Sequence, residues 1–266
     1  MDTPSNAADA ARRAAGHPWL ERAARLGYVA NGILHGVIGV LALVLAGGGS
    51  ADADQSGALQ ALAQQPFGSA LLWAGAAGSL LLGLWNVGEA VFDRGRAVER
   101  VKYAATGAVF LVVGTAFGRY ALGGRDDSGE AASSVSAELM GHPLGRVALI
   151  ALGAVLMGMC VYFVYKGVTR KFMEDLRVPG GRKRHLAIEA TGAVGYAAKG
   201  LVLGALGLLF IVATVQHNPE DATGIDGALK AVRDQSFGVP ALAAIGVGLI
   251  AYGVYLVFRS RYDTMD

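Results

Sequence analysis

The segment that decides the fold opens an apolar stretch near the N-terminus. Residues 27–32 read GYVANG, residues 195–200 read GYAAKG, and residues 102–107 read KYAATG, a looser copy. Further glycines keep the same register inside each copy, as at Gly39, Gly114 and Gly207. Self-similarity along a chain is the signature of a repeat architecture. We therefore predict three tandem copies of one unit.

The second half of each unit opens on a shared motif of its own. It reads PFG at 66–68, PLG at 143–145 and SFG at 236–238. Ser56, Ser133 and Asp226 stand at the same distance before these motifs, and each residue type is a favourable helix N-cap. We expect a short outer helix to begin at each of them.

Each copy contains two apolar stretches that can cross a membrane, which needs roughly 20 helical residues. The six stretches are 26–46, 69–92, 101–122, 147–168, 186–215 and 239–258. Composition agrees, because 53% of the 266 residues are hydrophobic and 17% are charged, whereas soluble domains carry about a quarter charged residues. The predicted fold class is an all-α polytopic membrane protein of six transmembrane helices. Because the copies enter the membrane in the same orientation, a pseudo-threefold bundle is their simplest arrangement.

The predicted organisation follows from these stretches and from the charge between them. Repeat 1 covers 19–93, repeat 2 covers 94–170 and repeat 3 covers 186–259, with a basic linker at 171–185 and tails at 1–18 and 260–266. Most of the 23 basic residues lie in the N-terminal tail, at 94–102, at 166–184 and at the C-terminus. The positive-inside rule then places both termini in the cytoplasm.

Several function classes find no support in the residues. Cys160 is the only cysteine, which leaves no disulfide framework and no cysteine-based metal site. No zinc-protease or phosphate-loop motif occurs, and the fourth and sixth spans lack the serine and the histidine of a rhomboid-like protease. A net charge of +2 gives no basis for nucleic-acid binding. We therefore expect that the protein is not an enzyme and that it binds no metal and no cofactor.

Polar residues inside the spans are the candidate functional residues, since a charge at the centre of a membrane helix is costly. Asn31, Thr106 and Lys199 occupy the same repeat position. In a threefold bundle they could form a selectivity ring or anchor a substrate. Alternatively, Lys199 extends its ammonium to the membrane surface, while Asn31 and Thr106 bond to neighbouring backbone.

Three more polar residues belong to the same candidate layer. His35 lies one turn beyond Asn31 and could relay protons, although a hydrogen-bonded structural role is the favoured interpretation. Asn86 and Glu89 lie near the cytoplasmic end of the second span. Glu89 aligns with Lys166 and Arg259. This alternation of sign favours a layer of charged residues at the helix ends over a catalytic role.

Small residues at helical spacing predict close contacts between helices. Gly32 with Gly36 and Gly200 with Gly204 form GxxxG pairs. They would serve internal packing or self-association. The expected partners are the lipid bilayer, other membrane proteins or a second copy of the chain.

The repeated glycine–tyrosine opening, the PFG-like start of each second helix and the threefold repetition resemble a bacterial membrane family, common in actinobacteria, catalogued as domain of unknown function 1206. The resemblance runs from about residue 19 to 258 and implies a bacterial cytoplasmic-membrane protein. The second copy departs from the pattern at Lys102 and Leu111. The family has no established activity, so the resemblance adds no chemistry.

Two functional hypotheses remain open. The first is a non-enzymatic integral membrane protein with a structural or accessory role, because no complete catalytic constellation is present. The second is a conduit or carrier for a small solute or ion, lined by Asn31, Thr106, Lys199 and His35.

Overall fold

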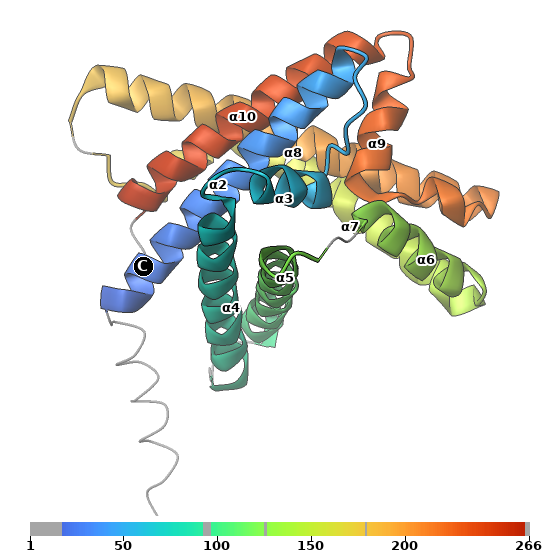
Figure 1. Cartoon of the computed structure of the whole chain (residues 1–266), viewed down its shortest axis with the longest axis horizontal. Helices are drawn as coiled ribbons and strands as arrows, with labels where there is room; N and C mark the ends of the chain where they lie inside the picture. Colours follow the sequence, from blue (N-terminus) through green and yellow to red (C-terminus); the bar gives the residue numbers. More distant parts are fainter. Residues whose placement is uncertain (1–17, 93–96, 125–126, 179, 264–266) are drawn as a thin grey trace, which may run out of the picture. The chain divides into compact units, whose positions relative to one another are not determined.

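The computed structural model describes residues 18–92, 97–124, 127–178 and 180–263, and their regular structure is helical apart from one isolated bridge (Figure 1). Within these ranges six helices are long and apolar enough to cross a membrane, so the chain is a multi-pass membrane protein. These are α2 (Pro18–Ala46), α4 (Gly68–Phe92), α5 (Ala97–Ala121), α7 (Pro143–Val168), α8 (Arg182–Gln216) and α10 (Gly238–Tyr262). The predicted all-α class with six spans is confirmed.

A short outer helix precedes the second span of every repeat, as predicted. The three are α3 (Gln55–Ala63), α6 (Ser128–Met140) and α9 (Gly224–Arg233). Each is followed by the glycine of the PFG-like motif. A Cβ atom at Gly68, Gly145 or Gly238 would overlap the carbonyl oxygen of Leu62, Leu139 or Val232, respectively. Glycine is therefore required there, because the turn between the two helices brings backbone against backbone.

The predicted N-caps were wrong. Helix α3 begins after Asp54, whose carboxylate accepts from the Gly57 amide at 2.9 Å. Helix α6 begins after Asp127, well before Ser133, whose hydroxyl instead donates to the Glu130 carbonyl at 3.0 Å. An aspartate just upstream outcompeted the serine in both repeats, since its carboxylate is a strong acceptor for first-turn amides.

In the third repeat, α9 begins after Thr223 without a side-chain cap. Gly224, the first residue of the helix, adopts a positive φ of 74°, a conformation that glycine reaches without the steric cost of a side chain. Asp226 lies inside the first turn and accepts from the Ala53 amide at 2.9 Å. Its carboxylate therefore joins two repeats instead of capping a helix.

The chain divides into two compact units, which are described separately. The first holds α4 and α5, and the second holds α2 from Gly32 onward, most of α3, and α6 to α10. The predicted arrangement of the repeats about a threefold axis, like the predicted side of each terminus, stays a prediction.

In the first unit, α4 packs closely on α5. A Cβ atom at Gly107 would lie 2.9 Å from the Val87 side chain and 3.1 Å from the Gly83 carbonyl oxygen. Two turns further, a Cβ atom at Gly114 would meet the backbone nitrogen of Leu80 at 2.9 Å. The two backbones approach because neither position carries a side chain.

In the second unit, the same contact occurs twice more. A Cβ atom at Gly200 would lie 2.9 Å from the Cys160 carbonyl oxygen on α7, beside Val164. Helices α2 and α10 lie side by side (Figure 1). A Cβ atom at Gly32 on α2 would lie 2.8 Å from the Gly253 carbonyl oxygen on α10, beside Val257. Gly107, Gly200 and Gly32 are equivalent in the repeat, and so are the three valines. One interface is thus built three times.

The helices that pair belong to different repeats. The second helix of repeat 1 (α4) contacts the first helix of repeat 2 (α5), and α7 of repeat 2 contacts α8 of repeat 3. Helix α10 of repeat 3 contacts α2 of repeat 1. The repeat visible in the sequence therefore differs from the packed pair in the fold, which joins two different repeats.

The departure of the second copy at Leu111 is accommodated by its partner. Leu111 replaces the glycine found at Gly36 and Gly204, and it packs over Gly83, whose Cβ position would lie 2.8 Å from the Leu111 side chain. In the α7–α8 pair the larger residue is on the other side, because Cys160 packs over Gly204. Each pair thus keeps a glycine on at least one side.

Replacement of Gly153 by alanine should destabilise the protein by about 1–3 kcal/mol, because overpacked interfaces must move apart. The new methyl group would lie 2.7 Å from the Gly207 carbonyl oxygen on α8. Gly158→Ala on the same helix is the matched control, since nothing lies within 4 Å of its Cβ position. Thermal unfolding in detergent measures both. Equal midpoints for the two variants would contradict the proposed contact.

Candidate functional site

The predicted polar layer is divided between the two units. Asn31 and Thr106 belong to the first unit, with Asn86 and Glu89, whereas His35 and Lys199 belong to the second. The ring of Asn31, Thr106 and Lys199 therefore stays a prediction. What the structure provides is the local environment of each side chain.

Two members of the layer bond to their own helix. The Thr106 hydroxyl donates to the Lys102 carbonyl at 2.8 Å, and the Asn86 amide donates to the Leu82 carbonyl at 2.8 Å. Such bonds one turn back are a common way for polar side chains to be satisfied in membrane helices. For Thr106 this is the backbone-bonded alternative considered from the sequence.

Lys199 has a different environment. Its ammonium donates to the Tyr252 hydroxyl on α10 at 3.1 Å. It also lies over two aromatic rings, 4.7 Å from the centre of Tyr252 and 5.1 Å from that of Phe163 on α7. Among the described residues no carboxylate lies within ion-pair distance of it. Aromatic faces and one hydroxyl thus hold the charge, as cation–π contacts can when water is excluded.

The ring of Tyr252 belongs to a larger aromatic cluster, defined by Tyr196, Tyr252, Tyr255 and Phe172. Tyr196 lies 5.3 Å from Phe172, 5.3 Å from Tyr252 and 5.4 Å from Tyr255, measured between ring centres. Tyr255 is fully buried, and its hydroxyl has no hydrogen-bond partner among the described residues. His35 packs edge-on against Tyr252 at 5.0 Å between ring centres, so this candidate residue borders the aromatic cluster.

Charged residues border the aromatic cluster at the end of α10. Arg259 donates to the Tyr196 hydroxyl at 3.2 Å and to the Asp263 carboxylate at 2.6 Å. Lys166 on α7 donates to Asp175 at 3.0 Å, and Arg259 lies 3.8 Å from the same carboxylate. Lys166 and Arg259 are the repeat equivalents of Glu89. In the second unit these two helix-end cations pair with the same carboxylate, that of Asp175.

Residues 171–177, which follow α7, pack against the aromatic cluster and the end of α10. Phe172, in a short 3-10 turn at Lys171–Met173, is fully buried in the aromatic cluster. A Cβ atom at Gly192 would overlap its ring, so glycine on α8 makes the room. Further on, Leu176 forms an antiparallel bridge with Asp263, and the Arg177 amide donates to the Tyr262 carbonyl at 2.9 Å.

Sequence reasoning identified Lys199 and His35 but missed Tyr252, Phe172 and Phe163. A signal was present. Tyr252 aligns with Leu82 and Met159, so it is a tyrosine where the other two repeats have an aliphatic side chain. Lys199, which it contacts, likewise differs from its repeat equivalents. Tyr196, at the second position of the GYAAKG motif, is buried as well.

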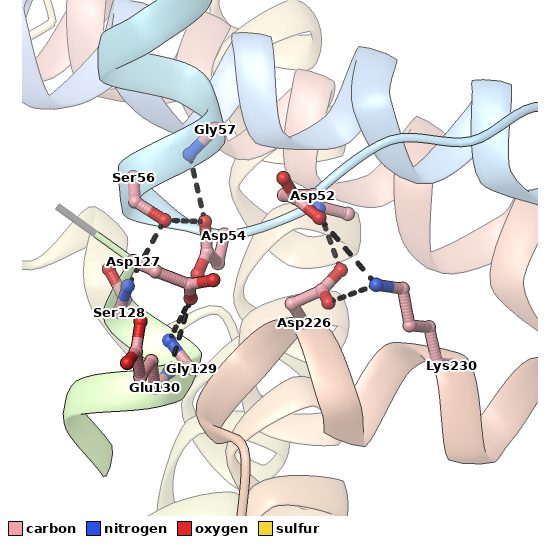
Figure 2. A network of polar contacts seen from close by, with 11 residues as sticks. Asp52, Asp54, Ser56, Gly57, Asp127, Ser128, Gly129, Glu130, Asp226 and Lys230 are labelled. Atoms are coloured by element: carbon pink, nitrogen blue, oxygen red, sulfur yellow. Dashed lines mark hydrogen bonds and ion pairs between the residues drawn. The ribbon is translucent and has the colours of Figure 1, made fainter. Parts of the chain in front are cut away.

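A second polar network joins the outer segments of the three repeats within the second unit (Figure 2). Ser56 accepts from the Ser128 amide at 3.4 Å and donates to Asp54 at 2.6 Å. Asp226 bonds the Ala53 amide and pairs with Lys230, which also lies 3.6 Å from Asp52. Among the described residues no group of three or more histidine, cysteine or acidic side chains could hold a metal ion. The network is a set of caps and ion pairs between repeats.

Electrostatics in this outer network differ from residue to residue. Burial raises the pKa of the Asp54 carboxyl, helped by the nearby charges of Asp226 and Asp52, against the hydrogen bonds from Ser56 and Gly57. The hydrogen bond to Asp226 raises the pKa of the Lys230 ammonium. Asp54 therefore keeps its proton to a higher pH than an ordinary aspartate does.

Comparisons with known proteins support the repeat assignment. The family model described as Domain of Unknown Function (DUF1206) matches residues 26–93, 101–170 and 194–263, one match in each predicted repeat. A Bacillus subtilis (strain 168) protein described as "Uncharacterized protein YxxB" is 30% identical over 256 residues, which cover 93% of each chain. No solved structure matches.

Tyr252→Phe should destabilise the protein by about 1–3 kcal/mol, because it leaves the Lys199 ammonium without its hydroxyl acceptor. Tyr162→Phe on α7 is the control, since that ring is exposed. The double variant Lys199→Met/Tyr252→Phe should regain most of the loss, because it removes both polar partners. Additive losses in the double-mutant cycle would rule out the contact.

The stability of the outer network should depend on pH through Asp54. Its folded-state pKa is raised, so between the ordinary aspartate value of about 3.9 and the raised value the folded chain keeps a proton that the unfolded chain releases. The contribution of Asp54 to the free energy of unfolding therefore falls as pH rises through this window. Asp54→Asn keeps an N-cap and should remove that slope. Chemical unfolding across pH 3–7 measures it, and an unchanged slope in the variant would contradict the assignment.

Proposed function

The chain belongs to the family described as Domain of Unknown Function (DUF1206), and on that premise we propose that it is a non-enzymatic protein of the bacterial cytoplasmic membrane with a structural or accessory role. In this proposal both termini face the cytoplasm. Its working parts are helix surfaces and not a reaction centre.

The observation that carries the proposal is the environment of Lys199. This is the residue for which sequence reasoning made the strongest case for a transport or binding role. Its ammonium is engaged by the Tyr252 hydroxyl and two ring faces of neighbouring helices. Because the Lys199 ammonium contacts side chains of α7 and α10, it holds these two helices to α8. Such contacts suit a rigid membrane scaffold.

Glycine packing gives the proposal further support. Backbones in contact along α7 and α8 and along α2 and α10 leave little freedom for helices to slide. Alternating-access carriers, by contrast, move one bundle against another. Close-packed, repeated interfaces favour a static role over a moving one.

The rival proposal is a conduit or carrier for a small solute or ion, with Asn31, His35, Thr106 and Lys199 as its polar layer. One observation favours it: no described carboxylate neutralises Lys199. A positive charge of this kind inside a span could attract an anion.

Flux measurements separate the two proposals. Purified protein reconstituted into vesicles should pass sodium, potassium, chloride, phosphate and protons no faster than vesicles without protein. The matched pair is Lys199→Met, which removes the charge, and Gly158→Ala, which touches no neighbour. Flux of any one solute that Lys199→Met abolishes and Gly158→Ala preserves would establish the conduit and refute the scaffold.

A further inference from the structure

The linker between α7 and α8 is fixed on its inner side. Phe172 is buried in the aromatic cluster, and Leu176 pairs with Asp263. Arg170 forms an ion pair with Glu189 on α8. These contacts hold residues 170–177 against the helices of the second unit.

The carboxylates of this region are largely engaged by other cations. Asp175 pairs with Lys166 and Arg259, and Glu189 pairs with Arg170. Arg182, Lys183 and Arg184 are exposed, and none has a carboxylate partner among the described residues. Three consecutive positive charges without a carboxylate partner therefore lie in the first turn of α8, where the positive end of the helix dipole makes them less favourable still.

Neighbouring residues place this triplet at the edge of the membrane. Helix α8 has 35 residues, which span about 52 Å at the α-helical rise, whereas the bilayer with its headgroups is about 40–45 Å thick. Exposed apolar side chains begin directly beyond the triplet at Leu186 and continue on α7 at Val168. The exposed ring of Tyr165 lies under the Lys171 ammonium at 5.0 Å, an aromatic–cation pair typical of the membrane–water boundary.

We propose that Arg182, Lys183 and Arg184, together with Lys171, bind the headgroups of anionic phospholipids in the membrane that the protein spans. The positive charge matches the phosphate, and the apolar side chains beside it contact the acyl chains. A soluble acidic partner would match only the charge. This inference goes beyond the proposed scaffold role and does not depend on it.

Native mass spectrometry of the purified protein tests the proposal. The protein is offered equal amounts of phosphatidylglycerol and phosphatidylcholine, and the ratio of the two bound lipids is measured. The wild type should prefer phosphatidylglycerol. The triple variant Arg182→Gln/Lys183→Gln/Arg184→Gln should lower that preference at least about fivefold, since each basic residue near an anionic surface contributes roughly this factor. The charge-conserving variant Arg182→Lys/Arg184→Lys should keep it.

Equal binding of the two lipids by the wild type would overturn the proposal, and so would an unchanged preference in the triple variant. Competition by inorganic phosphate as effective as that by phosphatidylglycerol would overturn it as well. Glutamine is a good helix former, so the variant should fold, which circular dichroism checks. A measurement on the wild type does not depend on the variant. Its preference should fall in 0.5 M salt, because exposed charges are screened there, and a preference that survives would also refute the proposal.

Discussion

Backbone contact at glycine is the constraint on which the described structure depends. In lipid no hydrophobic force drives one apolar helix onto another, so association relies on van der Waals contact and close approach. The chain meets this demand with one interface used three times, in which Gly107, Gly200 and Gly32 each face a backbone carbonyl and a valine of the partner helix. Each of these interfaces joins two different repeats, so no repeat makes the contact within itself. The outer network adds polar links between the same repeats.

The buried lysine and its tyrosine partner lie at positions where the three repeats differ in sequence. Lys199 takes the place of an asparagine and a threonine, and Tyr252 takes the place of a leucine and a methionine. The two changes meet in one hydrogen bond. Phe172 joins them from a linker that has no counterpart between the first two repeats. The Lys199 ammonium, the aromatic cluster and the charged pair of Arg259 and Asp175 thus lie together where α7, α8 and α10 meet.

Much of the architecture could be predicted from the sequence. Repeated glycine motifs and apolar length predict the three copies, the six spans and the outer helices, because each depends on local pattern. The starts of the outer helices could not be predicted, since Asp54, Asp127 and Gly224 competed with the expected caps and the outcome depended on contacts such as that of Asp226 with Ala53. Which helices pair was also hidden, because a glycine shows that a neighbour is close without identifying it. The partners of Lys199 were hidden for the same reason.

The pairing of α2 with α10 is the contact most distant in sequence and the one that tests the account most directly. A Cβ atom at Gly32 would lie 3.3 Å from the Leu256 Cβ atom, close to the separation that a disulfide requires. In a Cys160→Ala background, Gly32→Cys with Leu256→Cys should form an intramolecular disulfide on mild oxidation, seen as a mobility shift that reductant reverses. The control pair Gly36→Cys with Leu256→Cys should not form it, since nothing lies within 4 Å of the Gly36 Cβ position. A folded Gly32–Leu256 pair that stays reduced, or that forms no more disulfide than the control, would contradict the account.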